Sequence, residues 1–188
     1  MSATTAPPRT GNEIGRMTGL TLFTPVRPRW LLFLRLGFFV SWHAKVFNRH
    51  ILQFNFIKFV RWTVVRDLPG EGLETSYMLF ESNFDGPWQH YIDAFAYVIP
   101  KDIRLTWGRG INFPHPPPSE PLKAWIARNS MEGGTYYCAY PEASTRMVRG
   151  ALDVREGLRA LARDAERLGP EEFQAAYERF LVDVQADL

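Results

Sequence analysis

The order of the predicted secondary-structure elements indicates an α+β fold built on an antiparallel sheet. Residues 51–66 are rich in aromatic and β-branched side chains with partial alternation, which predicts a long strand. Residues 67–72 are typical of a turn, and residues 75–82 predict the next strand. Because one turn joins these two strands, residues 51–82 predict a β-hairpin. Helical patterns before and after the hairpin complete the α+β prediction.

The bounds of the remaining elements are predicted from prolines and glycines, which end or begin strands and helices. A short strand at residues 20–24 is ended by Pro25 and Pro28, and a helix covers residues 29–48. A helix capped by Asp85 or Gly86 runs to about residue 98. Further along, the pattern predicts a strand at residues 135–140 and two amphipathic helices separated by a Gly-Pro pair at residues 169–170.

These elements predict one domain with two additions. Without residues 100–131, the order is β-α-β-β-α-β, which is the ferredoxin-like split βαβ arrangement. We expect a disordered tail at residues 1–18 and a single domain over residues 19–188. Within it, residues 100–131 form a Pro-rich insertion, loop-like over 100–121 with a short helix at 121–129, and residues 142–188 form a C-terminal helical pair.

Charge is unevenly distributed along the chain. The net charge is +2, but residues 1–68 hold ten basic and two acidic side chains, a net of +8, and the remainder carries −6. Such a split favours a polyanion or a membrane surface as partner of the first third, or mutual neutralisation within the fold. Since a clustered basic stripe is missing, nucleic acid is not the expected partner.

Cysteine and histidine usage restricts the chemistry. The single cysteine, Cys138, excludes an intrachain disulfide and a cysteine-based zinc module, and it fits a cytoplasmic location. Its place within a predicted strand favours a buried, inert thiol. The four histidines form neither HxH nor HxxxH, so the sequence predicts no metal site.

Residues 30–42 are the most hydrophobic segment of the chain. Their 13 residues are fewer than the roughly 20 that a membrane-spanning helix needs. Two interpretations stay open: a helix buried against the sheet, or a helix in a membrane interface, with tryptophan near both ends and basic neighbours. Since apolar side chains occupy most of the helix surface, a partner chain, another segment or lipid must cover the excess.

Large apolar side chains on both faces of strand 51–66 lead to a prediction about assembly. One face of a ferredoxin-like sheet is covered by helices and the other is open. An aromatic open face needs a partner, and pairing two sheets produces a dimeric α+β barrel. The sequence therefore predicts a homodimer.

Residues 79–95, LFESNFDGPWQHYIDAF, carry a resemblance to known proteins. They resemble a family of uncharacterised bacterial proteins with a strand, a Ser/Thr-Asn-Phe-Asp-Gly turn and an amphipathic helix. The segments 54–62 and 139–144 share this resemblance, which covers about residues 19–165. The family has no established activity, so the resemblance bears on the fold more than on the function.

A looser similarity is to the dimeric α+β barrel superfamily, which includes dye-decolorising peroxidases, chlorite dismutases and small haem-degrading monooxygenases. The peroxidases carry Gly-x-x-Asp-Gly, with the aspartate beside haem. Here Ser82-Asn83-Phe84-Asp85-Gly86 keeps the final Asp-Gly and lacks the first glycine. The cofactor stays open, and this similarity makes haem one candidate, with His90 and Trp88 on the helix that carries the haem ligand in the monooxygenases. Periodicity places His90 roughly opposite the buried stripe to which Trp88 belongs.

Polar side chains near the predicted hairpin are the candidate site residues. Asn83 and Asp85 suit a catalytic acid or ligand anchor, and they equally suit helix capping. Arg61 interrupts an apolar strand, so it binds an anion if its face lines a cavity and otherwise pairs with an acid such as Glu81. Candidate cavity walls, which are equally typical of plain core, are Trp62, Trp107, Tyr136 and Tyr137.

We therefore expect a protein that binds a hydrophobic small molecule in a sheet-lined cavity. If it is an enzyme, fold analogy favours an oxidoreductase of the peroxidase or monooxygenase type. Asp85 would donate or accept a proton, Arg61 would clamp an anion and Asn83 would orient the ligand. The alternative is a non-enzymatic peripheral-membrane or protein-interaction module that uses residues 27–49.

Overall fold

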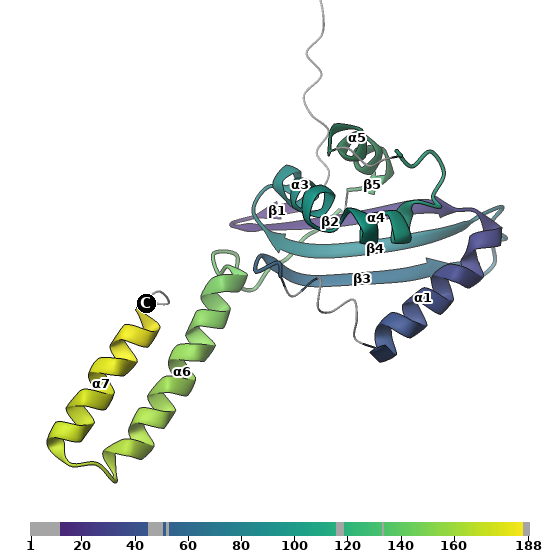
Figure 1. Ribbon diagram of the computed structural model, residues 1–188. Helices are drawn as coiled ribbons and strands as arrows, with labels where there is room; N and C mark the ends of the chain where they lie inside the picture. The colour runs from purple at the N-terminus through teal and green to yellow at the C-terminus, as the bar shows by residue number, and fades with distance from the viewer. Residues whose placement is uncertain (1–11, 45–50, 52, 116–118, 133, 186–188) are drawn as a thin grey trace, which may run out of the picture. The chain divides into compact units, whose positions relative to one another are not determined.

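The computed structural model describes residues 12–44, 51, 53–115, 119–132 and 134–185. The chain divides into two compact units, Met1–Glu142 and Ala143–Leu188. Figure 1 shows the course of the chain.

The first unit contains an open, five-stranded antiparallel sheet (Figure 1). Its path runs β1-β2-β4-β3, and β5 pairs with β2 beside β1. β3 and β4 form the expected hairpin, with Arg61 opposite Glu81. The predicted antiparallel α+β class is therefore confirmed. β3 begins only at Ile57, so the strand expected over residues 51–66 is wrong for residues 51 and 53–56. The strands are β1 (Asn12–Ile14), β2 (Met17–Val26), β3 (Ile57–Val65), β4 (Ser76–Asp85) and β5 (Ser130–Met131).

Helices cover one face of this sheet. Alternate residues of β4 are buried, among them Met78, Phe80 and Phe84, and they join the helices in one apolar core. Figure 1 shows α3 and α4 over the same face of the sheet. The helices of this unit are the 3-10 turn η1 (Pro28–Trp30), α1 (Leu31–Ala44), α3 (Trp88–Val98), α4 (Pro100–Trp107) and α5 (Ser119–Asn129).

The start of the chain differs from the expectation. Residues 1–11 lie outside the described residues, but residues 12–14 form β1 and β2 already begins at Met17. The prediction of a disordered tail through residue 18 is therefore wrong for its last part. β2 pairs along its whole length with β4, so its first residues are ordered by backbone hydrogen bonds, and Met17 and Thr18 are buried as well.

The helix that follows β4 is amphipathic, as expected. α3 buries Trp88, Tyr91, Ile92, Phe95 and Ala96 and leaves His90 exposed.

Its start differs from the prediction. The N-cap residue is Pro87, without a side-chain cap, while Asp85 still belongs to β4. The turn between them uses Gly86 at a φ of +89°, where an L side chain is strained. The capping role predicted for Asp85 or Gly86 is therefore wrong.

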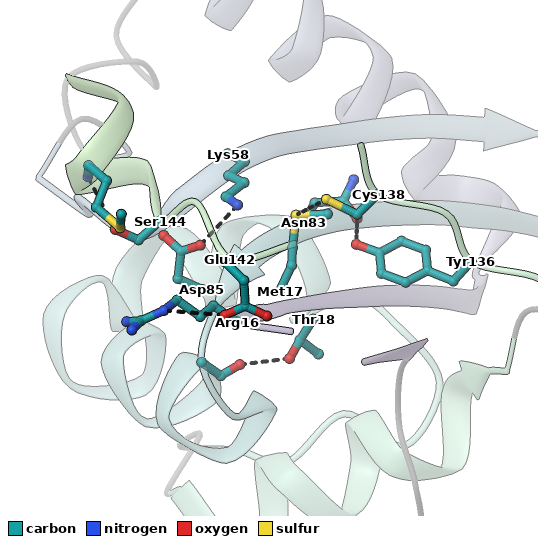
Figure 2. Close-up of polar contacts among 12 residues, drawn as sticks. Arg16, Met17, Thr18, Lys58, Asn83, Asp85, Tyr136, Cys138, Glu142 and Ser144 are labelled. Carbon is teal, nitrogen blue, oxygen red and sulfur yellow. Dashed lines mark hydrogen bonds and ion pairs between the residues drawn. The ribbon is translucent and has the colours of Figure 1, made fainter. Parts of the chain in front are cut away.

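The prediction of a strand at residues 135–140 is also wrong. These residues form no strand, and the edge of β2 that they would need is occupied by β1 at Met17–Gly19 and by β5 at Thr21 and Leu22. Because that edge of β2 is occupied, the aromatic composition of the segment does not produce a strand there. The Tyr136 side chain instead lies against the open face of the sheet (Figure 2).

The Pro-rich insertion is more helical than expected. Pro100, expected only to end the preceding helix, occupies the first turn of α4, where proline is favourable because no backbone hydrogen bond is lost. The loop-like interpretation of residues 100–121 is therefore wrong for residues 100–107. The short helix predicted at 121–129 is confirmed as α5, which begins two residues earlier.

The second unit is a hairpin of two helices, α6 (Thr145–Ala165) and α7 (Pro170–Val184). Ser144 caps α6, because its Oγ accepts a hydrogen bond from the Met147 backbone N–H at 3.1 Å. Gly157 allows close packing, since a Cβ there would lie 2.7 Å from the Phe180 ring. The predicted helical pair is thus present. In the predicted stripe of α6, Leu161 is buried, whereas Val148, Leu152 and Leu158 are exposed.

Candidate functional site

The open face of the sheet carries the three predicted catalytic residues in a row. Asn83 and Asp85 occupy alternate positions of β4, and Arg61 of β3 lies opposite Glu81 on the same face. Alternate residues of a strand are roughly 7 Å apart, so about 13 Å of strand separates Asp85 from the Arg61–Glu81 pair. The structure therefore places the three residues on one face without bringing them to one point.

Asp85 has a partner that the sequence did not reveal. Lys58 Nζ lies 3.2 Å from the Asp85 carboxylate, and both side chains are largely shielded, at 22% and 15% exposure. A register shift between Ile57 and Phe59 produces a β-bulge at Lys58. The sequence pattern does not indicate this ion pair, because the alternation of apolar and polar residues does not reveal a bulge. Figure 2 shows this ion pair at the end of β4.

Asn83 is held by the segment that was expected to be a strand. The Tyr136 hydroxyl donates a hydrogen bond to Asn83 Oδ1 at 2.8 Å (Figure 2). Burial, followed by the nearby Cys138, raises the pKa of the Tyr136 phenol, which therefore remains a donor at neutral pH. Gly19 makes the approach possible, since a Cβ there would lie 2.9 Å from the Tyr136 ring. Asn83 thus has a structural role.

Cys138 lies beside Met17, with 3.9 Å between the two sulfur atoms (Figure 2). The thiol is only partly buried, so the expectation of a buried thiol is not met.

Two of the aromatic residues that were expected to form cavity walls, Trp107 and Tyr137, do not lie in similar surroundings. Trp107 is buried in the core, whereas the Tyr137 side chain is 81% exposed.

His90 and Trp88 do not form one haem site. Trp88 is buried beneath α3, whereas His90 is exposed on the same helix. Because the two side chains differ in this way, they cannot enclose one planar cofactor between them. Within the described residues, no group of three or more His, Cys, Asp or Glu side chains could hold a metal ion.

An open apolar groove lies where α1 and α4 approach β3. Its volume is about 650 Å³, and most of its lining side chains are aliphatic or aromatic. Arg61 and Trp62, both candidate residues from the sequence, border it, and so does the exposed Leu105 of α4. The lining residues are Phe33, Leu34, Gly37, Phe38, Ser41, Trp42, Ile51, Val60, Arg61, Trp62, Leu105 and Thr106.

Arg61 stands at the polar border of this groove. β3 is the outermost strand on its side of the sheet, so a side chain on the open face can reach around the edge. The guanidinium forms an ion pair with Glu81 and stays 56% exposed. The predicted pairing with Glu81 is therefore present, and Arg61 also borders a groove, while anion binding by Arg61 stays a prediction.

A second cavity lies within the core beneath α3 and α4. It measures only about 20 Å³ and its lining includes Leu22, Phe80 and Trp107. A void of this size holds one water molecule at most, and an apolar lining gives that water no hydrogen-bond partners. Of these two cavities, only the groove has room for a small molecule.

Comparisons with protein-family models, with curated proteins and with solved structures found no match to this chain. The assignment of a function therefore depends on the geometry alone.

Proposed function

We propose that the protein binds an amphipathic small molecule, whose apolar body occupies the α1–β3–α4 groove and whose anionic group contacts Arg61. The observation that carries this proposal is the groove itself. At about 650 Å³ it falls within the roughly 300–1,000 Å³ typical of ligand sites. Its apolar lining with a few polar groups also matches the usual composition of such sites.

The polar border of the groove supports an anionic ligand. Arg61 offers five N–H donors in a planar fork, and Glu81 accepts only at Nη2 among the contacts described. The remaining donors can bind a carboxylate, which is a strong geometry for arginine. Ser41 and Thr106 add two hydroxyl groups to the lining. The ligand class that fits best is a long-chain carboxylic acid or a compound of similar shape.

Oxidoreductase chemistry remains a prediction from the sequence. The residues proposed for it, Asp85 and Asn83, lie on the open face, paired with Lys58 and hydrogen-bonded to Tyr136. They do not line the groove. The proposal therefore concerns binding and assigns no reaction.

We also propose that the sheet is ferredoxin-like and that two copies pair through their open faces. The order β5-β2-β4-β3, with α1 between β2 and β3 and α3 between β4 and β5, supports the fold. On the open face, Phe59 is 44% exposed and Phe23 stacks on Tyr77 at 4.3 Å, which supports the pairing. Sedimentation velocity tests it: a dimer is expected, which Phe59→Ser should weaken, and a wild-type monomer contradicts the proposal.

The groove proposal is tested with cis-parinaric acid, a fluorescent long-chain carboxylic acid. Binding should be saturable in the wild-type protein. Gly37→Leu should weaken it at least tenfold, because a Cβ at Gly37 meets no atom within 4 Å and the new side chain enters the groove without disturbing the core. Equal affinity in the wild type and Gly37→Leu would overturn the groove proposal.

Two further comparisons separate the groove from other apolar surfaces. Val40→Leu is the matched control, because Val40 lies on the same helix but outside the lining. Its affinity should be unchanged. Arg61→Gln should weaken binding of the acid about tenfold while leaving the corresponding long-chain alcohol unaffected, as expected for the loss of one charge-assisted hydrogen bond.

A further inference from the structure

We propose that the outward face of α1 docks onto an anionic membrane surface, with the helix lying parallel to the membrane plane. The outward face consists of Leu32, Leu36, Phe39 and Val40. This inference is independent of the groove ligand, because these four side chains do not line the groove.

α1 leaves a large apolar area uncovered. Of its 14 residues only Leu34 is buried, whereas the side chains of Leu32, Leu36 and Phe39 are exposed by 77%, 58% and 61%. With 100° per residue these three side chains lie opposite Leu34, on the side turned away from the sheet. A helix that is apolar all round needs a nonpolar environment on its outer side too.

The charge of the segment around α1 selects the partner. Residues 14–66 contain nine Lys or Arg and no Asp or Glu. Arg27 and Arg29 are exposed immediately before α1, and Arg35 is exposed within it. Acids near the groove belong to other segments: Glu81 of β4 pairs with Arg61, and Asp102 lies on α4. An apolar face with only cationic neighbours on its own segment complements an anionic lipid surface.

A tryptophan lies near each end of α1. Trp30 immediately precedes the helix, and Trp42, which also borders the groove, occupies its last turn with its side chain 82% exposed. Tryptophan is enriched at membrane–water interfaces because its ring is amphipathic. The guanidinium of Arg109 lies 4.1 Å from the Trp30 ring, which adds a cation at this end.

The geometry distinguishes docking from insertion. A helix of 14 residues is about 21 Å long, which is shorter than the roughly 30 Å hydrocarbon core. Among the described residues, no helix is long and apolar enough to cross a membrane. The proposal is therefore a helix at the interface, anchored by its apolar face and its arginines.

The test is co-sedimentation of the full chain with phosphatidylcholine vesicles that contain phosphatidylserine. The wild-type protein should bind these vesicles and bind pure phosphatidylcholine vesicles much more weakly. Leu36→Ser/Phe39→Ser should abolish binding. Arg29→Gln and Arg35→Gln should each weaken it about fivefold, the equivalent of about 1 kcal/mol per basic residue near an anionic surface.

Matched controls keep the test specific. Val182→Ser removes an apolar side chain that is 70% exposed on α7, and Arg155→Gln removes a basic residue of α6. Both should bind like the wild type, and circular dichroism should show every variant folded. Equal binding by Leu36→Ser/Phe39→Ser would overturn the proposal. So would a wild type that ignores the vesicles and forms a dimer dissociated by the same substitutions, because a second copy would then cover the face.

Discussion

Two apolar helices of the first unit, α1 and α3, are used in opposite ways. α3 buries five side chains against the sheet and leaves its polar residues outside. α1 is the more apolar in composition, yet only Leu34 is buried. The comparison teaches that apolar content alone does not place a helix in the core. The position of a helix relative to the sheet decides whether its apolar side chains are buried. The exposed apolar surface of α1 is therefore a candidate binding surface.

The stability of the first unit should therefore depend on α3 far more than on α1. Phe95 is buried between Phe54 and Tyr91, with ring centroids 5.0 and 4.5 Å away. We expect Phe95→Ala to lower the free energy of unfolding by about 3–5 kcal/mol, because it leaves a cavity in the core. Urea denaturation measures this value. A loss below about 1 kcal/mol would remove the contrast between the two helices.

Tyr91 sharpens the same contrast through a polar contact. Its hydroxyl donates to Ser82 Oγ at 2.7 Å within the core. Tyr91→Phe should cost about 1–3 kcal/mol, because Ser82 Oγ then stays buried without this donor. Adding Ser82→Ala to Tyr91→Phe should cost less than the sum of the two single changes. Strict additivity in the double-mutant cycle would contradict the proposed pair.

The same residue makes α3 sensitive to alkaline pH. Burial raises the pKa of the Tyr91 phenol, while the hydrogen bond with Ser82 acts in the opposite sense. The folded protein therefore keeps its proton where unfolded tyrosine, with a pKa near 10, releases it. Stability should be unaffected below about pH 10 and should fall as the pH rises further. Tyr91→Phe should have a weaker alkaline dependence in otherwise identical denaturation experiments.

The smaller effects are expected on α1. Gly37 lies within the helix and a Cβ there meets no atom within 4 Å. Gly37→Ala should therefore raise the free energy of unfolding by about 0.5–1 kcal/mol, since alanine loses less backbone entropy in a helix. Thermal unfolding measures the gain. A destabilised variant would mean that α1 is packed more closely than the structure shows.

The smallest effect should come from the outer face of α1. Phe39→Ala removes an aromatic ring that is mostly exposed, so stability should change by no more than about 0.5 kcal/mol. Set beside Phe95→Ala, this variant compares the same substitution on both helices. A large loss without vesicles would show that Phe39 is buried in solution by another copy of the chain.

Much of the fold could be predicted from residue patterns. Alternation identified the β3–β4 hairpin, and helical periodicity identified the buried stripe of α3 with His90 outside it. The strand expected at residues 135–140 failed, because pairing depends on a free edge and β1 and β5 occupy the edge of β2. Local composition contains no information about which edges remain free.

In the candidate site, too, some residues could be predicted from the local pattern and others could not. Arg61 could be identified because a charged residue interrupts an apolar strand, and it does border a cavity and pair with Glu81. Lys58 was missed, because a bulge turns it towards Asp85. Asn83 had no visible partner in the sequence, since Tyr136 reaches it across 53 residues.

The sequence by itself determined the secondary structure of the main elements, the α+β class and the basic, acid-free character of residues 14–66, because these depend on local periodicity and composition. Only the tertiary structure decided that α1 leaves its apolar face open and forms a groove with β3 and α4. The physical reason is that burial and cavity formation depend on contacts between segments far apart in the chain. The apolar excess of residues 30–42 could be read from the sequence, but the face that carries it could not.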